Sequence, residues 1–268
     1  MALIAILVVL LLIILFLVWF MYRMGHPRPG EPRFIYNFRR SPTAIPEYLA
    51  LLAGGLFHPH LLRIGSTRQE RMEPLPGDDL VPHPQFQETR ATTIDVPANH
   101  LWPWIVQLGA GRGGWYWWTP GEAFPEYAQY IINTQRILEQ FQTLEVGDRL
   151  SDGGPYATED RGNWIVRAVE PNRHLVLFAA RQVTGGADFD PGVDTPKGMW
   201  FVSSWVFVLR PIGTGQTCLL VRLRVIGGPA WMFLLLRFIL SKGDRVAHNS
   251  MFERIKTRAE AYYLPRML

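Results

Sequence analysis

The sequence predicts an α+β domain behind one apolar N-terminal helix, and three observations support this fold class. The first is a run without charged residues, dominated by Leu, Ile and Val, from Ala2 to Tyr22. The second is a series of segments in the second half of the chain in which apolar and polar residues alternate, as in strands. The third is an amphipathic helical pattern after Gly243. Because strands and helices come in separate blocks rather than in alternating βαβ units, we expect an α+β arrangement.

The composition excludes two classes of protein. Hydrophobic residues make up 48% and charged residues 19% of the 268 residues, so the chain can bury a core and is not disordered. The formal net charge is +4, but the arginines are scattered rather than gathered on one element, so we expect no nucleic-acid partner. Cys218 is the single cysteine, which rules out an intrachain disulfide and a cysteine-based zinc site. We expect neither a metal nor a cofactor.

We assign residues 1–24 as a transmembrane anchor, because roughly 20 apolar residues suffice to cross a bilayer. A cleaved signal peptide is the rival interpretation, but a positive n-region, a shorter apolar core and a small-residue cleavage site are all missing. Trp19 and Tyr22 suit the headgroup layer. Arginines follow the span and none precedes it, so we expect a single-pass protein of the cell membrane with a cytoplasmic domain. These arginines are Arg23, Arg28, Arg33, Arg39 and Arg40.

Residues 25–73 are predicted to be a tether, because prolines recur in them and break regular structure. Within the tether, Tyr48 to Leu62 is apolar but is interrupted by Gly and Pro, and we interpret it as an interfacial or domain-packing segment. A second membrane contact at this segment stays open. The domain then extends over residues 74–263.

Hydrophobic periodicity predicts the elements of this domain. We expect helices at Ala98 to Leu108, at Thr134 to Leu144 and at Trp231 to Leu240, and a long helix at the end. The expected strands are Thr89 to Val96, Trp164 to Val169, Leu175 to Ala180, Trp200 to Leu209 and Thr217 to Val225, the last four as antiparallel neighbours.

The faces of two elements follow from their patterns. In the last strand Leu219, Val221, Leu223 and Val225 alternate with Leu220, Arg222 and Arg224, so one face is expected to be buried and the other to meet water. In the strand before it, Trp205, Phe207 and Leu209 share the apolar face. The final helix places one set of residues on a buried stripe and Arg254, Lys256, Arg258 and Glu260 on its outer side. The stripe consists of Ala247, Met251, Ile255, Ala259 and Tyr262.

Several short motifs in the sequence resemble the START-like or polyketide-cyclase (SRPBCC) superfamily, in particular its membrane-anchored bacterial members. The resemblance covers about Gly77 to Ala261 and is strongest in GDDLVP, TRATTIDVPANHLWPWIVQLGAGRGGWY, LEVGDRL and MFERIKTRAEA. It implies a helix-grip fold, in which a curved antiparallel sheet wraps a long C-terminal helix and encloses a pocket for apolar ligands. One fold hosts carriers, receptors and cyclases, so the resemblance implies ligand capacity rather than a reaction.

We therefore expect a membrane-tethered module whose partners are the bilayer and an apolar small molecule such as a lipid, an isoprenoid or a polyketide-like compound. Aromatic residues at the expected mouth of the pocket, and apolar residues on its walls, are the candidate ligand contacts. These are Trp115, Trp117, Trp118, Trp164, Trp205, Phe207 and Met251. Plain core packing is the alternative for the aromatic stretch that begins at Trp115, whereas Trp102 and Trp104 are expected in the core.

Two further functions stay open. An acid–base cyclase or dehydratase would need charged groups facing the pocket, and a scaffold would fill the pocket with its own side chains. The candidate acid–base residues are Glu122, Glu126, Asp148, Glu159, Asp160, Arg167 and His174. No GxSxG occurs, and Cys218 falls inside a predicted strand, so covalent catalysis is not expected.

Four further motifs do not indicate a nucleotide, calcium or metal site. The glycines from Gly109 to Gly114 have the spacing of a dinucleotide fingerprint, but they follow a helix and lead into Trp115, so we expect a turn with close backbone approach. The acidic loop DFDPGVD (Asp188 to Asp194) lacks the closing carboxylate of a calcium loop. His58 and His60 have no nearby carboxylate or thiol. Asp78 and Asp79 are expected to make turn hydrogen bonds.

Overall fold

The computed structural model describes residues 65–116, 133–152, 162–182, 187–194, 196, 198–231, 248 and 251–263. All of them belong to the unit formed by Gly54–Leu268. The predicted anchor, most of the tether with His58 and His60, and nearly all of the segment Trp231 to Leu240 lie outside these residues. Among the residues that are described, no helix is both long enough and apolar enough to span a bilayer.

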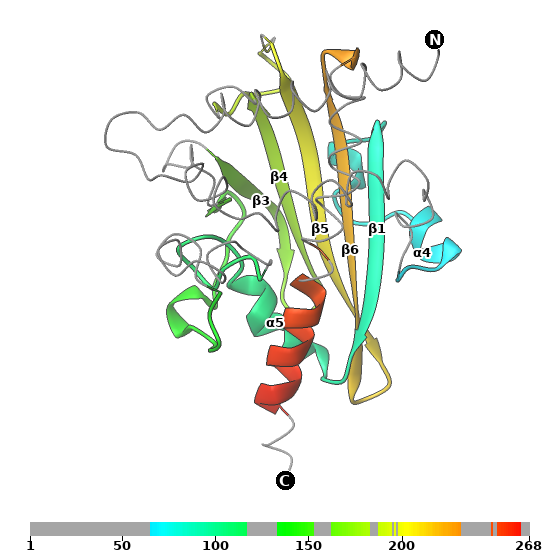
Figure 1. The fold of residues 1–268 in the computed structure, drawn as a ribbon, viewed down its shortest axis with the longest axis vertical. Coiled ribbons are helices and arrows are strands. Elements are labelled where there is room, and N and C mark those ends of the chain that lie inside the picture. The colour runs from blue at the N-terminus through cyan, green and yellow to red at the C-terminus, as the bar shows by residue number, and fades with distance from the viewer. Residues whose placement is uncertain are drawn as a thin grey trace, which may run out of the picture. The chain divides into compact units, whose positions relative to one another are not determined.

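The core of the fold is a six-stranded antiparallel sheet (Figure 1). Its strands are β1 (Phe86–Ile94), β2 (Arg149–Ser151), β3 (Asn163–Glu170), β4 (His174–Gln182), β5 (Trp200–Ile212) and β6 (Gln216–Gly228). Their order across the sheet is β1-β6-β5-β4-β3-β2, so each strand from β2 to β6 pairs with its neighbour in sequence. The prediction of four consecutive antiparallel strands is confirmed. The first strand closes the far edge by pairing with the last.

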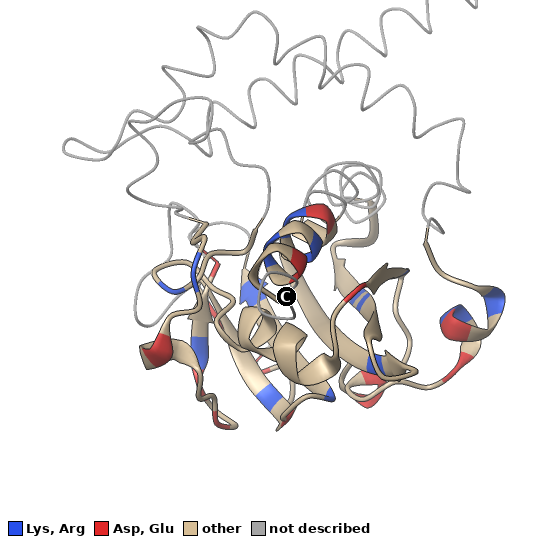
Figure 2. Cartoon of the chain, turned by 90° about the horizontal axis from the view of Figure 1, so that it is seen from below, with Lys and Arg blue, Asp and Glu red and all other residues tan. Residues whose placement is uncertain are grey.

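Helix α5 (Ala98–Val106) and a final helix over residues 251–263 cover one face of the sheet, which we call the interior face (Figure 2). The sheet curves around the final helix, as in a helix-grip fold. Leu219, Val221 and Leu223 of β6 lie in this core, as the alternation predicts. Met251, Ile255 and Ala259 are also buried there and Tyr262 is partly buried against the same core, as predicted for the stripe of the final helix. Ala247 lies outside the described residues.

The opposite face of the sheet, which we call the outer face, differs from the prediction. Leu220 and Arg222 were expected to meet water, but both are fully buried. They are covered by helix α4 (Arg68–Met72), the short 3₁₀ helix η2 (Asp78–Leu80) and the chain between them. Helix α4 falls within the segment predicted to be tether, and it opens with a capping box formed by Thr67 and Glu70.

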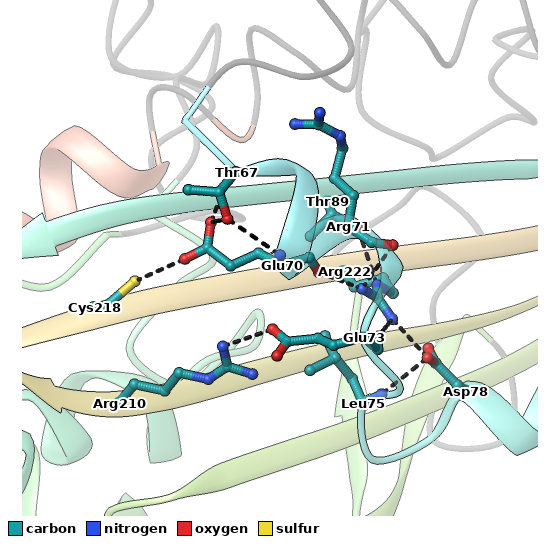
Figure 3. Close-up of polar contacts among 10 residues, drawn as sticks. All are labelled: Thr67, Glu70, Arg71, Glu73, Leu75, Asp78, Thr89, Arg210, Cys218 and Arg222. Atoms are coloured by element: carbon teal, nitrogen blue, oxygen red, sulfur yellow. Dashed lines mark hydrogen bonds and ion pairs between the residues drawn. The ribbon is translucent and has the colours of Figure 1, made fainter.

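Arg222 is the residue that holds this covering segment to the sheet (Figure 3). Its guanidinium group donates to the carbonyl oxygens of Glu70, Arg71 and Glu73, to Asp78 Oδ2 and to Thr89 Oγ1. These acceptors match the five N–H donors of an arginine. Burial lowers the pKa of Arg222, and the charge of Asp78 opposes that shift. A charged side chain can be buried on this face because the covering backbone supplies the acceptors that water would otherwise supply.

Three other elements differ from their predictions. Strand β1 begins at Phe86, earlier than Thr89. Strand β2, which is short, was not predicted. The helix expected over Thr134 to Leu144 is replaced by turns and a three-residue 3₁₀ helix, η4 (Glu139–Phe141).

The side chain of Gln107, at the end of α5, accounts for the missing helix. Its amide donates to the carbonyl oxygen of Arg136 (3.2 Å), and its oxygen accepts from the backbone N–H of Leu138 (3.0 Å). These contacts satisfy backbone groups that a helix would pair internally, so the segment can lie extended against α5. The glycine turn before it agrees with its prediction: Gly109 bonds to Gly114, and a Cβ at Gly113 would lie 2.8 Å from the Gln107 carbonyl oxygen.

Candidate binding site on the interior face

The register of the sheet decides which side chains meet on the interior face. Residues that pair across antiparallel strands point to the same side. Trp205 of β5 pairs with Leu223 of β6 and with Leu177 of β4, and Leu223 pairs in turn with Glu88 of β1. These four side chains therefore form one row across the interior face of the sheet.

An aromatic cluster centred on Trp205 occupies the middle of this face. The indole ring of Trp205 stacks on Trp115, with centroids 5.2 Å apart, and lies 5.3 Å from Trp164 and 4.9 Å from Phe207. His248, a helical residue, meets the same indole edge-on at 5.3 Å. The indole N–H of Trp115 donates to the carbonyl oxygen of Ser151 at the end of β2 (2.9 Å). The cluster thus joins β2, β3, β5 and the segment after α5.

The structure brings together several residues that the sequence singled out as ligand contacts. Trp115, Trp164 and Phe207 all touch Trp205. Met251 belongs to the same core cluster and is fully buried. Trp117 and Trp118 lie outside the described residues. A role in ligand binding stays a prediction for all seven. Trp102 and Trp104 are buried, in agreement with their predicted place in the core.

A buried ion pair on β1 is the feature that sequence reasoning missed. Glu88 and Arg90 are each only 2% exposed, and the Arg90 guanidinium donates to the Glu88 carboxylate. Both residues share the face of Phe86 and Ile94, which are core residues. A signal was present in the sequence: counting in steps of two from Phe86 to Ile94 places Glu88 and Arg90 on the interior face. The predicted strand began at Thr89 and so did not include Glu88.

Tyr116 is fully buried in the same core. Its hydroxyl accepts from Gln107 Nε2 (2.5 Å), and the Arg258 guanidinium lies over its ring at 5.2 Å. Burial raises the pKa of Tyr116 to about 12, against the smaller opposing effects of Gln107 and Arg258. Arg258 also donates to the carbonyl oxygen of Thr134 (2.9 Å). The expectation that Arg258 lies on a solvated outer side is therefore wrong, because it clamps the final helix to the segment after α5.

The acid–base candidates in the described residues do not face the interior. Asp148 is exposed in the turn before β2 and accepts from the Glu145 backbone N–H. Arg167 is exposed and lies over the Phe178 ring on the outer face. His174 pairs with Val208 on the outer face and lies 3.5 Å from Glu170. Glu122, Glu126, Glu159 and Asp160 lie outside the described residues.

Two acidic motifs have structural partners. Asp188, in the predicted solvated loop, pairs with Arg181 and Arg149, and burial raises the pKa of its carboxyl group despite these charges. Asp78 accepts from the Leu75 backbone N–H, as expected of a turn residue, and also pairs with Arg222 and Arg224. Asp78 lies on the outer face, whereas Asp188 contacts Arg181, a residue of the interior face. Among the residues that the structure describes, no group of three His, Cys, Asp or Glu side chains is placed to hold a metal.

No family model and no curated protein matches this sequence. Several solved structures are similar in fold. A protein from Mesorhizobium loti is 18% identical, with 66% of this chain and 98% of that chain covered and a TM-score of 0.34. A hypothetical protein from Helicobacter pylori is 9% identical, with 69% and 95% covered and a TM-score of 0.38. A norcoclaurine synthase from Thalictrum, solved with a transition state analogue, is 12% identical, with 66% and 95% covered and a TM-score of 0.29.

Proposed function

We propose that this protein binds an apolar small molecule between the interior face of its sheet and the final helix, while its N-terminal segment holds it at the membrane. The molecule would be a lipid, an isoprenoid or a polyketide-like compound. The resemblance to the START-like superfamily agrees with this function, because that fold encloses pockets for such ligands. The helix-grip arrangement of sheet and helix is what such binding requires.

The observation that carries the proposal is the makeup of the interior face. Aromatic side chains around Trp205 supply a large apolar surface, and a few polar groups are set among them. Ligand sites typically have this composition, with a largely apolar lining and a few placed polar groups that orient the ligand. A core built for stability alone would gain from apolar residues at Glu88 and Arg90, because a buried ion pair is often no better than a well-packed apolar pair. Retaining the pair therefore favours a role in recognition.

Membrane tethering fits the same chemistry. An apolar ligand partitions into the bilayer, so a domain held beside the bilayer meets it at high local concentration. The run from Ala2 to Tyr22 is long enough to span, and the arginines after it favour a cytoplasmic domain. Full-length protein should therefore stay with membranes through an alkaline wash. Protease added outside intact cells should spare the domain; digestion of the domain there would overturn the proposed topology.

Native mass spectrometry of the full-length protein, extracted in mild detergent, tests the binding function. We expect a co-purifying small molecule of low polarity. Ala179→Leu should lower its occupancy, because Ala179 is buried on the interior face beside Ser203. Ala168→Leu is the matched control, since Ala168 packs against the outer face and should leave occupancy unchanged. Absence of any bound molecule, together with no uptake of a fluorescent fatty acid or sterol analogue, would overturn the proposal.

A further inference from the structure

Strand β5 carries two adjacent buried serines that face opposite sides of the sheet. Ser203 is 2% exposed and pairs with Val225 and Ala179, so its side chain lies on the interior face with Trp205. Ser204 is 3% exposed and pairs with Arg224 and Phe178 on the outer face. The two serines are alike in residue type and burial, and they differ in the face of the sheet on which their side chains lie.

The hydroxyl of Ser203 has no hydrogen-bond partner within the part of the chain that the structure describes. Leaving a buried hydroxyl unpaired costs about 1–3 kcal/mol, whereas alanine at the same position would avoid that cost. The two residues paired with Ser203 across the sheet, Ala179 and Val225, are apolar, so neither replaces the lost contact with water. A hydroxyl kept in such a place is available to a group that does not belong to the chain.

Ser203 has a small neighbour on only one side of the interior face. Ala179 lies directly across on β4, whereas Val225 lies directly across on β6. By contrast, the next two interior positions of β5 are the large aromatics Trp205 and Phe207. The sheet therefore contributes little side-chain volume on the β4 side of Ser203 and much more above the aromatic cluster. A ligand that lies on the cluster would extend toward Ser203.

The charges on this face decide which polar group fits. Glu88 and Arg90 pair with each other, and Arg181 pairs with Asp152 and Asp188. A carboxylate placed near Ser203 would have to compete with Glu88, Asp152 or Asp188 for its counter-charge, and burying it without one is costly. An uncharged hydroxyl or carbonyl group carries no such cost.

We propose that Ser203 Oγ hydrogen-bonds an uncharged hydroxyl or carbonyl group of the apolar ligand. The ligand class is then an apolar alcohol or ketone rather than a free fatty acid. This inference rests on the proposed binding function and adds the polar contact to it.

Farnesol and farnesene, which share a carbon skeleton and differ in the hydroxyl, test the inference. They are titrated against the full-length chain in lipid nanodiscs by tryptophan fluorescence, with empty nanodiscs as the blank. Ser203→Ala should weaken farnesol binding about five- to tenfold, the worth of one hydrogen bond, and leave farnesene binding unchanged. Ser204→Ala should change neither affinity. The melting temperature of Ser203→Ala without ligand should not fall, because no hydrogen bond within the chain is lost.

Each contrary result has a distinct meaning. Equal affinity of farnesol for wild type and Ser203→Ala would overturn the Ser203 contact, and continued farnesene binding would leave the binding function standing. A lowered melting temperature of unliganded Ser203→Ala would reveal a partner within the chain and would also overturn the contact. Binding of neither compound to wild type would count against the contact and the proposed function together.

Discussion

Arg222 should be the most costly single side chain to remove from the outer face. We consider Arg222→Met, which keeps the length of the side chain and removes its five donors. The side chain is 1% exposed, so the carbonyl oxygens of Glu70, Arg71 and Glu73 would lose a partner that water cannot readily replace. Asp78 would keep Arg224 as a partner. Breaking one side of a buried ion pair typically costs about 3–5 kcal/mol, a large part of the roughly 5–15 kcal/mol that stabilises a domain.

Urea unfolding of the full-length protein, followed by tryptophan fluorescence, measures this loss. Arg210→Met is the matched control: Arg210 pairs with Glu73 of the same segment, but its side chain is 37% exposed. An exposed pair is worth about 0–1 kcal/mol, so the control should lose little stability. Hydrogen exchange in residues 68–73 should also speed up in Arg222→Met, because α4 would lose its attachment. Equal losses of stability in the two variants would refute the anchoring role of Arg222.

Three further predictions concern the interior face and the segment after α5. Met251→Asp should cost several kcal/mol of stability and unfold much of the protein, because the carboxylate would be buried without a partner. Thr257→Asp, on the exposed side of the same helix, should change stability by about 0.5 kcal/mol or less. Urea unfolding measures both. Gly113→Ala should lower stability by about 1–3 kcal/mol, because the added Cβ would crowd Gln107. Gly215→Ala, which has open space around it, should leave stability unchanged. Similar melting temperatures for the two variants would contradict the close packing at Gly113. The third prediction concerns stability at alkaline pH. The folded-state pKa of Tyr116 is raised to about 12, so the contribution of its protonated form to the free energy of unfolding is complete below about pH 10. That contribution, about 2–3 kcal/mol, is lost as the pH rises to about 12. Tyr116→Phe should therefore lose less stability than wild type over that pH range, and parallel losses would show that Tyr116 is not the responsible group.

Much of the sheet could be predicted from local patterns. The strands from Trp164 to Val225 were located within a few residues of their observed limits, because period-two alternation and turn residues are local properties. The interior stripe of the final helix was likewise readable from Met251, Ile255 and Ala259. The expected helix at Thr134 to Leu144 was wrong for a non-local reason, since Gln107 takes the backbone hydrogen bonds that the helix would have used.

The candidate site was predictable only in part. The alternation of apolar and polar residues predicts that Trp205 and Phe207 lie on the same face of their strand, and the structure confirms this. The contact between Trp205 and Trp115 joins residues far apart in the sequence and depends on how the segment after α5 folds back onto the sheet. Ser203 gives no local signal, because a serine in a strand is equally compatible with either face until the register is known.

The sequence by itself determined the α+β class, the antiparallel neighbours and the buried stripe of the final helix, since each follows from hydrophobic spacing along a short stretch of chain. Only the tertiary structure decided which polar residues are buried. Glu88, Arg90 and Arg222 have the composition of a solvated strand face, and whether they meet water depends on what covers them. For Arg222 the cover is the chain around α4, whose carbonyl oxygens accept its hydrogen bonds; for Glu88 and Arg90 it is the interior that the sheet and helices enclose. Such burial costs free energy unless distant groups supply partners, so no local pattern can disclose it.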